Sequence, residues 1–99
     1  MEPLSPEAVR QALTALPGWS GDERALRRTF RFATFADAIA YLHACAPGID
    51  ALNHHPEWTN VYDRVSVVLR THDAGDRVTA ADLALARHLD ATAAPFAQR

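Results

Sequence analysis

Residues 53–72 read NHHPEWTNVYDRVSVVLRTH, and this stretch decides the fold that the sequence predicts. Two of its segments, 58–62 and 65–71, are rich in β-branched and aromatic residues, which is typical of strands. Only Asp63 and Arg64 separate them, so a β-hairpin with a tight turn at these two residues is expected. Alternate positions of the second strand share one side of the sheet, namely Val65, Val67, Leu69 and Thr71.

The chain before this hairpin predicts a second antiparallel pair of strands. Residues 26–32 alternate between apolar and polar side chains, which is the pattern of a strand buried on one face. Residues 19–21 are a candidate partner strand, joined to it through residues 22–24. Both strand pairs are local in sequence, which favours an antiparallel sheet.

Capping signals mark the starts of three helices. Ser5 precedes a proline, and the pairs Thr34 with Asp37 and Thr79 with Asp82 match the capping-box pattern. Apolar side chains follow at helical spacing after each start. They are Val9, Ala12, Leu13 and Leu16, then Phe35, Ala38, Ile39, Leu42 and Ala46, then Leu85, Leu89, Ala93 and Phe96. On sequence alone, the helix cap is a sufficient explanation for Thr79 and Asp82.

The elements follow the order αββαββα and predict an α+β fold in two layers. We expect an antiparallel four-stranded sheet with three helices packed on one face, formed by a single domain over residues 1–99. Pro47 and Gly48 are expected to break or kink the second helix, with residues 49–53 adding a further turn that carries Asp50.

The histidines are the candidate functional residues. A turn centred near residue 63 pairs His54 with His72 across the hairpin. Pro56 cannot donate a backbone hydrogen bond, so pairing should end near it. His54 and His55 are then expected in a loop beyond the strand, with His72 at the opposite strand end.

This cluster suits proton transfer at neutral pH, because imidazole titrates near pH 6.5. Asp50 lies about one helical turn before His54 and could orient a histidine or accept a proton from a ligand. Trp58 and Tyr62 could supply a flat apolar wall, although packing is the commoner role of such residues.

The histidines have two alternative interpretations. A lone surface histidine is usually only solvated, and this explanation suffices for His43 and His88. Three imidazoles with Asp50 could hold zinc, but His54 and His55 are neighbours, and neighbours in an extended segment point apart. We therefore predict no metal at the site.

Composition narrows the function classes. The 99 residues carry a net charge of −2, with no basic excess that would indicate nucleic acid. Cys45 is the one cysteine, so no disulfide framework is expected within the chain. The N-terminus lacks a signal-peptide pattern, and no apolar run could span a membrane. We expect a cytoplasmic protein.

The sequence resembles the pterin-4a-carbinolamine dehydratase family. The resemblance rests on Asp50-x-x-x-His54-His55-Pro56-Glu57-Trp58, followed by Tyr62, His72-Asp73, Gly75, Thr79 and Asp82. Weaker matches extend through Thr34-Phe35, Phe30-x-Phe32 and Gly18-Trp19, so nearly the whole chain is covered.

The resemblance implies elimination of water from a 4a-hydroxytetrahydropterin, giving the quinonoid dihydropterin that a reductase recycles. It implies His54 and His72 as acid and base, and His55 as a binding residue that shares the proton work. Asp50 stands where members often carry glutamate; with Pro56 and Trp58 it is expected to bind substrate. No metal or organic cofactor is implied, and the expected assembly is a homodimer or homotetramer.

The alternative, from another class, is a non-catalytic module for protein assembly or regulation with the same fold. Dehydratase-like domains act in such roles elsewhere. A pure scaffold has no chemical need for all three histidines, which favours the enzyme.

Overall fold

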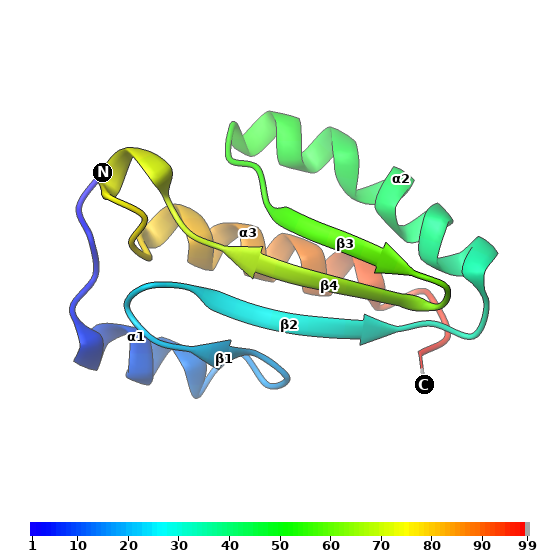
Figure 1. Ribbon diagram of the computed structural model, residues 1–99, viewed down its shortest axis with the longest axis horizontal. Helices are drawn as coiled ribbons and strands as arrows, with labels where there is room; N and C mark the ends of the chain where they lie inside the picture. Colours follow the sequence, from blue (N-terminus) through cyan, green and yellow to red (C-terminus); the bar gives the residue numbers. More distant parts are fainter. Residues whose placement is uncertain (99) are drawn as a thin grey trace.

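The computed structural model describes residues 1–98 and confirms the predicted element order (Figure 1). The helices and strands are α1 (Pro6–Leu13), β1 (Ser20–Gly21), β2 (Leu26–Arg31), α2 (Phe35–Leu52), β3 (Glu57–Val61), β4 (Arg64–Leu69) and α3 (Ala80–Ala93). A short 3₁₀ helix, His72–Ala74, follows β4. Within the described residues, no helix is both long and apolar enough to cross a lipid bilayer.

The four strands form one antiparallel sheet in the order β1-β2-β4-β3. The helices lie on one face, where α2 and α3 pack against each other and against β4 (Figure 1). Alternate strand residues point into this layer and are buried, as the periodicity predicted. They include Leu26, Phe30, Val65, Val67 and Leu69, which meet Val9, Tyr41, Leu85 and Leu89 from the helices.

The predicted turn of the second hairpin is wrong by one residue. Val61 pairs with Arg64, so Tyr62 and Asp63 form the turn. Tyr62 adopts a left-handed backbone conformation with φ 54°, which closes a two-residue turn. The Asn60 side-chain amide fixes this geometry by donating to the carbonyl oxygens of Tyr62 at 3.2 Å and Arg64 at 2.8 Å.

The corrected register changes which residue faces His54. Glu57 pairs with Val68, and extending this pairing outward sets Thr71 opposite His54. His72 lies one residue further on, in the 3₁₀ helix. A shift of one residue reverses the side to which a strand residue points. Thr71 is accordingly buried and His72 is exposed.

The expected break of the second helix at Pro47 is also wrong, because α2 continues to Leu52. Proline removes one backbone hydrogen bond but leaves the neighbouring ones available. His88 of α3 donates from Nε2 to the Cys45 carbonyl oxygen at 3.1 Å and ties this region to the neighbouring helix. A Cβ on Gly48 would lie 2.1 Å from His88 Cε1, so glycine is what allows the ring to pack there.

Candidate active site

The loop that follows α2 carries His54 and His55. Asn53 ends the helix in the left-handed conformation, with φ 50°, and turns the chain back toward the sheet. Pro56 then precedes β3, which begins at Glu57. Since both ends of this loop belong to regular elements, the two histidines are held beside the end of β4.

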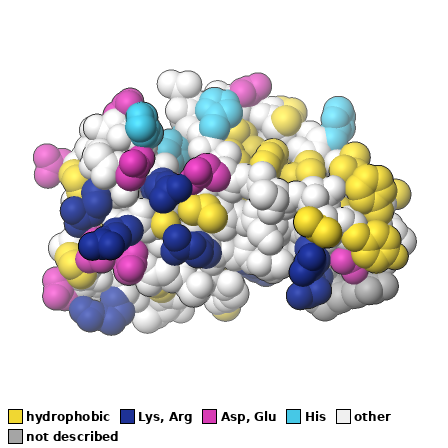
Figure 2. All heavy atoms as spheres, viewed as in Figure 1, with side chains coloured by type: hydrophobic (Ala, Val, Ile, Leu, Met, Phe, Trp, Pro, Cys, Tyr) yellow, Lys and Arg dark blue, Asp and Glu magenta, His cyan; other side chains and the backbone are white. Residues whose placement is uncertain are grey.

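One open hollow of about 220 Å³ brings together the three predicted histidines. Its lining consists of Asn53, His54, His55, Arg70, Thr71, His72 and Asp73. Figure 2 shows histidine, acidic and arginine side chains gathered at one end of the molecule, with hydrophobic side chains at the other end. The predicted grouping of His54, His55 and His72 is therefore present in the structure.

His54 is anchored to a buried carboxylate. Its Nε2 lies 2.6 Å from Oδ1 of Asp82, and the two side chains are 15% and 0% exposed. The other carboxylate oxygen, Oδ2, accepts from Thr79 N and from Thr71 Oγ1, both at 2.9 Å. The two hydrogen bonds to Oδ2 fix the carboxylate, and the fixed carboxylate holds the ring of His54 through Oδ1.

The capping box predicted at Thr79 is confirmed, but it does not exhaust the role of Asp82. Oδ2 completes the cap, while Oδ1 faces the histidine. The cap motif alone could not reveal this second contact, which joins residues 28 positions apart. The predicted hairpin register could not reveal Thr71 as a further partner of Asp82, because Thr71 lies opposite His54 only in the observed register.

His55 pairs with Asp50. Its Nε2 lies 3.1 Å from Asp50 Oδ1, and both side chains are largely exposed. This contact exists because α2 runs unbroken through Pro47 to the end of the helix. Asp50 therefore orients the second histidine of the pair rather than the first.

His72 pairs with Asp76 at the outer side of the hollow. Its Nδ1 lies 3.0 Å from Asp76 Oδ1, and the histidine side chain is 92% exposed. The hydrogen bond to Asp76 and the charge of that carboxylate raise the pKa of His72, and the charge of Asp73 adds to this. His72 thus keeps its proton to a higher pH than a free histidine.

Each imidazole contacts a carboxylate through one ring nitrogen, and its other nitrogen can take part in proton transfer. His54 and His55 contact their carboxylates through Nε2, which leaves Nδ1, whereas His72 uses Nδ1 and leaves Nε2. A histidine held this way donates a proton from the remaining nitrogen when protonated and accepts one there when neutral. The arrangement can therefore deliver one proton and remove another.

The aromatic residues expected as a wall lie elsewhere. Trp58 is half-buried and packs against the core, and Tyr62 is exposed at the turn, at the far end of the hairpin. Neither belongs to the lining of the hollow that the three histidines share. Pro56 is half-buried directly after His55.

A second, wider hollow adjoins the first. It measures about 450 Å³ and is lined by His55, Glu57, Arg70, His72 and Asp76. Arg70 Nη2 lies 2.8 Å from Glu57 Oε2 in this wall. Sequence reasoning singled out neither residue for the site, because an arginine and a glutamate on strands usually indicate only a solvated face.

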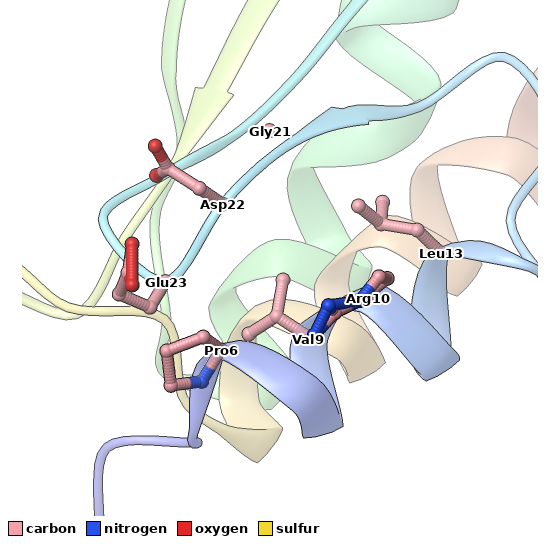
Figure 3. Close-up of a pocket in the computed structure, with 7 residues that line it drawn as sticks. All are labelled: Pro6, Val9, Arg10, Leu13, Gly21, Asp22 and Glu23. Carbon is pink, nitrogen blue, oxygen red and sulfur yellow. The ribbon is translucent and has the colours of Figure 1, made fainter.

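Another hollow, of about 240 Å³, lies between α1 and the loop after β1 (Figure 3). Its apolar side comes from Pro6, Val9 and Leu13, and it contains no histidine. Asp22 at its rim accepts from Arg24 N at 2.8 Å, and this bond lowers the pKa of the carboxyl group. That contact closes the turn between β1 and β2, so the hollow offers no comparable acid and base pair.

Within residues 1–98, no three His, Cys, Asp or Glu side chains are arranged so that they could hold a metal ion. The three imidazoles are instead directed to three different carboxylates. The zinc-site alternative thus gains no ligand set from this geometry.

Comparison with known proteins identifies the family to which this fold belongs. A family model described as pterin 4 alpha carbinolamine dehydratase matches residues 2–92, and the chain belongs to this family. A protein of Opitutus terrae is 48% identical over 88% of this chain and 90% of its own length. One of Rhodopseudomonas palustris is 47% identical over 97% and 96%. Both carry the name pterin-4-alpha-carbinolamine dehydratase only provisionally.

Two solved structures are similar. A transcriptional coactivator/pterin dehydratase from Brucella melitensis has a TM-score of 0.85 and 38% identity, covering 91% of this chain and 97% of that one. A pterin dehydratase-like protein identified as a RuBisCO assembly factor in the α-carboxysome has a TM-score of 0.62 and 25% identity, covering 76% and 86%. One protein of similar structure is thus described by an assembly role.

Proposed function

We propose that this protein eliminates water from a 4a-hydroxytetrahydropterin to form the quinonoid dihydropterin. The bond between C4a and the hydroxyl oxygen breaks, and the leaving hydroxyl takes a proton to become water. A ring nitrogen loses a proton, and its electrons form the new double bond to C4a. One proton is delivered and one is removed, so the total number of protons on the site is unchanged, and proton exchange with water returns each histidine to its starting form.

The histidines divide this work in the proposal. His72 is the acid, since Asp76 raises its pKa and keeps Nε2–H available. His54 is the base, with Nδ1 free and the ring fixed by Asp82. His55 binds and positions the pterin, oriented by Asp50. Pro56 supplies an apolar contact beside it, while Trp58 supports the strand below the loop.

The observation that carries the proposal is the single hollow shared by three imidazoles, each bound to its own carboxylate. The side chains of an assembly surface need only be complementary in shape and charge. Here the buried Asp82 directs a carboxylate oxygen to His54, which lines an open hollow. Such an arrangement is typical of acid–base catalysis.

The direct test is the rate of dehydration of freshly generated 4a-hydroxytetrahydropterin with and without the protein. We expect a rate that rises linearly with protein concentration and saturates with substrate. A rate equal to the spontaneous one at all concentrations would contradict catalysis.

The second candidate is an assembly or regulatory module, which the similarity to the RuBisCO assembly factor favours. A module of this kind would bind its partner equally well after all three histidines are replaced by alanine. Absence of dehydratase activity in the wild type would favour this candidate.

We also propose that the chain forms a homodimer or homotetramer. Phe35 and Ile39 on α2, with Val61 and Tyr62 at the hairpin turn, are large hydrophobic side chains left exposed. The strand β3 is an edge of the sheet with one side unpaired. Light scattering at micromolar concentration should report two or four chains, and a monomer alone would contradict this.

A further inference from the structure

Arg70 stands at the boundary of the two hollows beside the histidines. It lines both of them, together with His55 and His72. Its neighbours Leu69 and Thr71 are buried, so the alternation of the strand directs Arg70 to the face away from the helices. A ligand that lies against His54 in the smaller hollow and extends into the wider one meets this guanidinium.

Glu57 holds the guanidinium in place. Because Glu57 pairs with Val68, Arg70 is its diagonal neighbour across the two strands. The contact of 2.8 Å uses Nη2 of the arginine and Oε2 of the glutamate. The remaining guanidinium N–H groups and the other carboxylate oxygen stay available to a ligand.

The ion pair between Arg70 and Glu57 is expected to add little to the stability of the fold. Both side chains are more than a third exposed, and exposed pairs contribute little to folding. Arg70 nevertheless lines both the hollow of His54 and the wider one, and Glu57 lines the wider one beside it. The position of the pair thus matters more for a ligand than for the fold.

We propose that Arg70 and Glu57 together recognise the pyrimidinone edge of the pterin, an inference that rests on the proposed function. This edge presents an acceptor, the C4 oxygen, next to a donor, the N3–H. The pair presents the complementary order, a guanidinium donor next to a carboxylate acceptor. The site therefore selects 4-oxo pterins and rejects 4-amino analogues, whose amino group would face the guanidinium with a donor.

The chemistry of the reaction gives this contact a purpose. C4 is bonded directly to C4a, so holding the C4 oxygen fixes the direction of the leaving hydroxyl toward the imidazoles. Positive charge develops around C4a as the hydroxyl departs. The carboxylate of Glu57 offsets the charge of Arg70, so the contact positions the ring without opposing that step.

Binding of 6,7-dimethylpterin and of its 4-amino counterpart, measured by fluorescence titration, tests the inference. Wild type should prefer the 4-oxo compound, and Arg70→Gln should weaken its binding roughly 10- to 100-fold, which is the loss expected for a hydrogen bond to a charged group. Binding of the 4-amino compound should change little, so the preference collapses. In turnover, Arg70→Gln should raise KM and also lower kcat, because the ring is no longer held with its hydroxyl toward the imidazoles.

Arg64→Gln is the matched control, because Arg64 is exposed at the start of β4, the strand that Arg70 directly follows, and lines neither hollow. It should leave both affinities and KM unchanged, and melting curves should be alike for all three proteins. If Arg70→Gln binds both compounds as wild type does, the inference is overturned while dehydration by the wild type still supports the proposed function. If wild type binds with the Arg70-dependent preference but does not accelerate dehydration, only the proposed function falls.

Discussion

His54 and His72 are the same chemical unit, an imidazole on a carboxylate, built in two different ways. The carboxylate of His54 is Asp82, which is fully buried and also caps α3. The carboxylate of His72 is Asp76, which lies in an exposed loop next to a 3₁₀ helix. The first unit is therefore part of the fold and the second is only attached to it. Changes at the two should separate stability from proton transfer.

Replacing Asp82 should have the largest effect. Asp82→Ala removes the acceptor of Thr79 N–H and of the Thr71 hydroxyl, two buried donors. The expected loss in free energy of unfolding is about 3 kcal/mol. For a chain of this length, thermal denaturation should show a fall in Tm of roughly 10–20 °C.

Asp76→Asn is the matched change on the other unit. It removes a carboxylate charge that meets only exposed groups and keeps a residue type suited to the left-handed backbone at this position, where φ is 57°, so Tm should stay within experimental scatter. Equal losses of stability for the two variants would contradict the contrast between a built-in and an attached histidine.

The histidines themselves sharpen the contrast. His54→Ala leaves Oδ1 of the buried Asp82 without its partner and should cost about 1–2 kcal/mol, whereas His72→Ala should cost almost nothing. The sequence predicted a loop position for His54 and a strand end for His72, and it did not predict the buried partner of His54. Chemical denaturation of the two variants measures the difference, and equal unfolding free energies would remove it.

The sequence predicted the features that depend on neighbouring residues, but not the contacts between distant parts of the chain. The element order, the capping box at Thr79, the N-cap at Thr34 and the grouping of three histidines follow from local patterns and are confirmed. The hairpin register failed because it depends on the positive φ of Tyr62 and on the Asn60 side chain, which strand propensity does not report. Register decides which side chain reaches Asp82, so the error passed into the site.

The continuity of α2 was missed for a similar reason. Pro47 and Gly48 indicate a helix break when only their neighbours in sequence are considered. The His88 ring, 40 residues beyond Gly48, takes the space that a glycine leaves free. Asp82 and Arg70 were missed as site residues because their contacts with His54 and Glu57 join distant parts of the chain.

The pH dependence of the reaction separates the two units further. In Asp76→Asn the carboxylate that raises the pKa of His72 is gone, and the pKa should fall toward its ordinary value of about 6.5. The acid form is then lost at lower pH, so the alkaline limb of the kcat/KM profile should move to lower pH. In the wild type, this pair stabilises the fold below the ordinary histidine pKa, and that contribution disappears as pH rises through the raised value.

Titration of His72 by NMR in both proteins gives the same shift independently of turnover. An alkaline limb that stays in place while the NMR pKa falls would show that His72 is not the acid.

Chelation should have the smallest effect. If the two histidine units act by proton transfer alone, exhaustive treatment with a chelator should leave kcat and KM unchanged. A bridging metal would instead couple the two units. Activity that vanishes on chelation and returns with stoichiometric zinc would contradict the metal-free mechanism.

The account depends most directly on the two histidines acting together as acid and base. Turnover of 4a-hydroxytetrahydropterin should be measured for His54→Ala, His72→Ala and the double variant, with His43→Ala as an exposed control on α2. Each single variant should lose roughly 10²-fold in kcat, the double variant should lose more than either, and the control should match wild type. A double variant that stays folded and turns over at the wild-type rate would contradict the account.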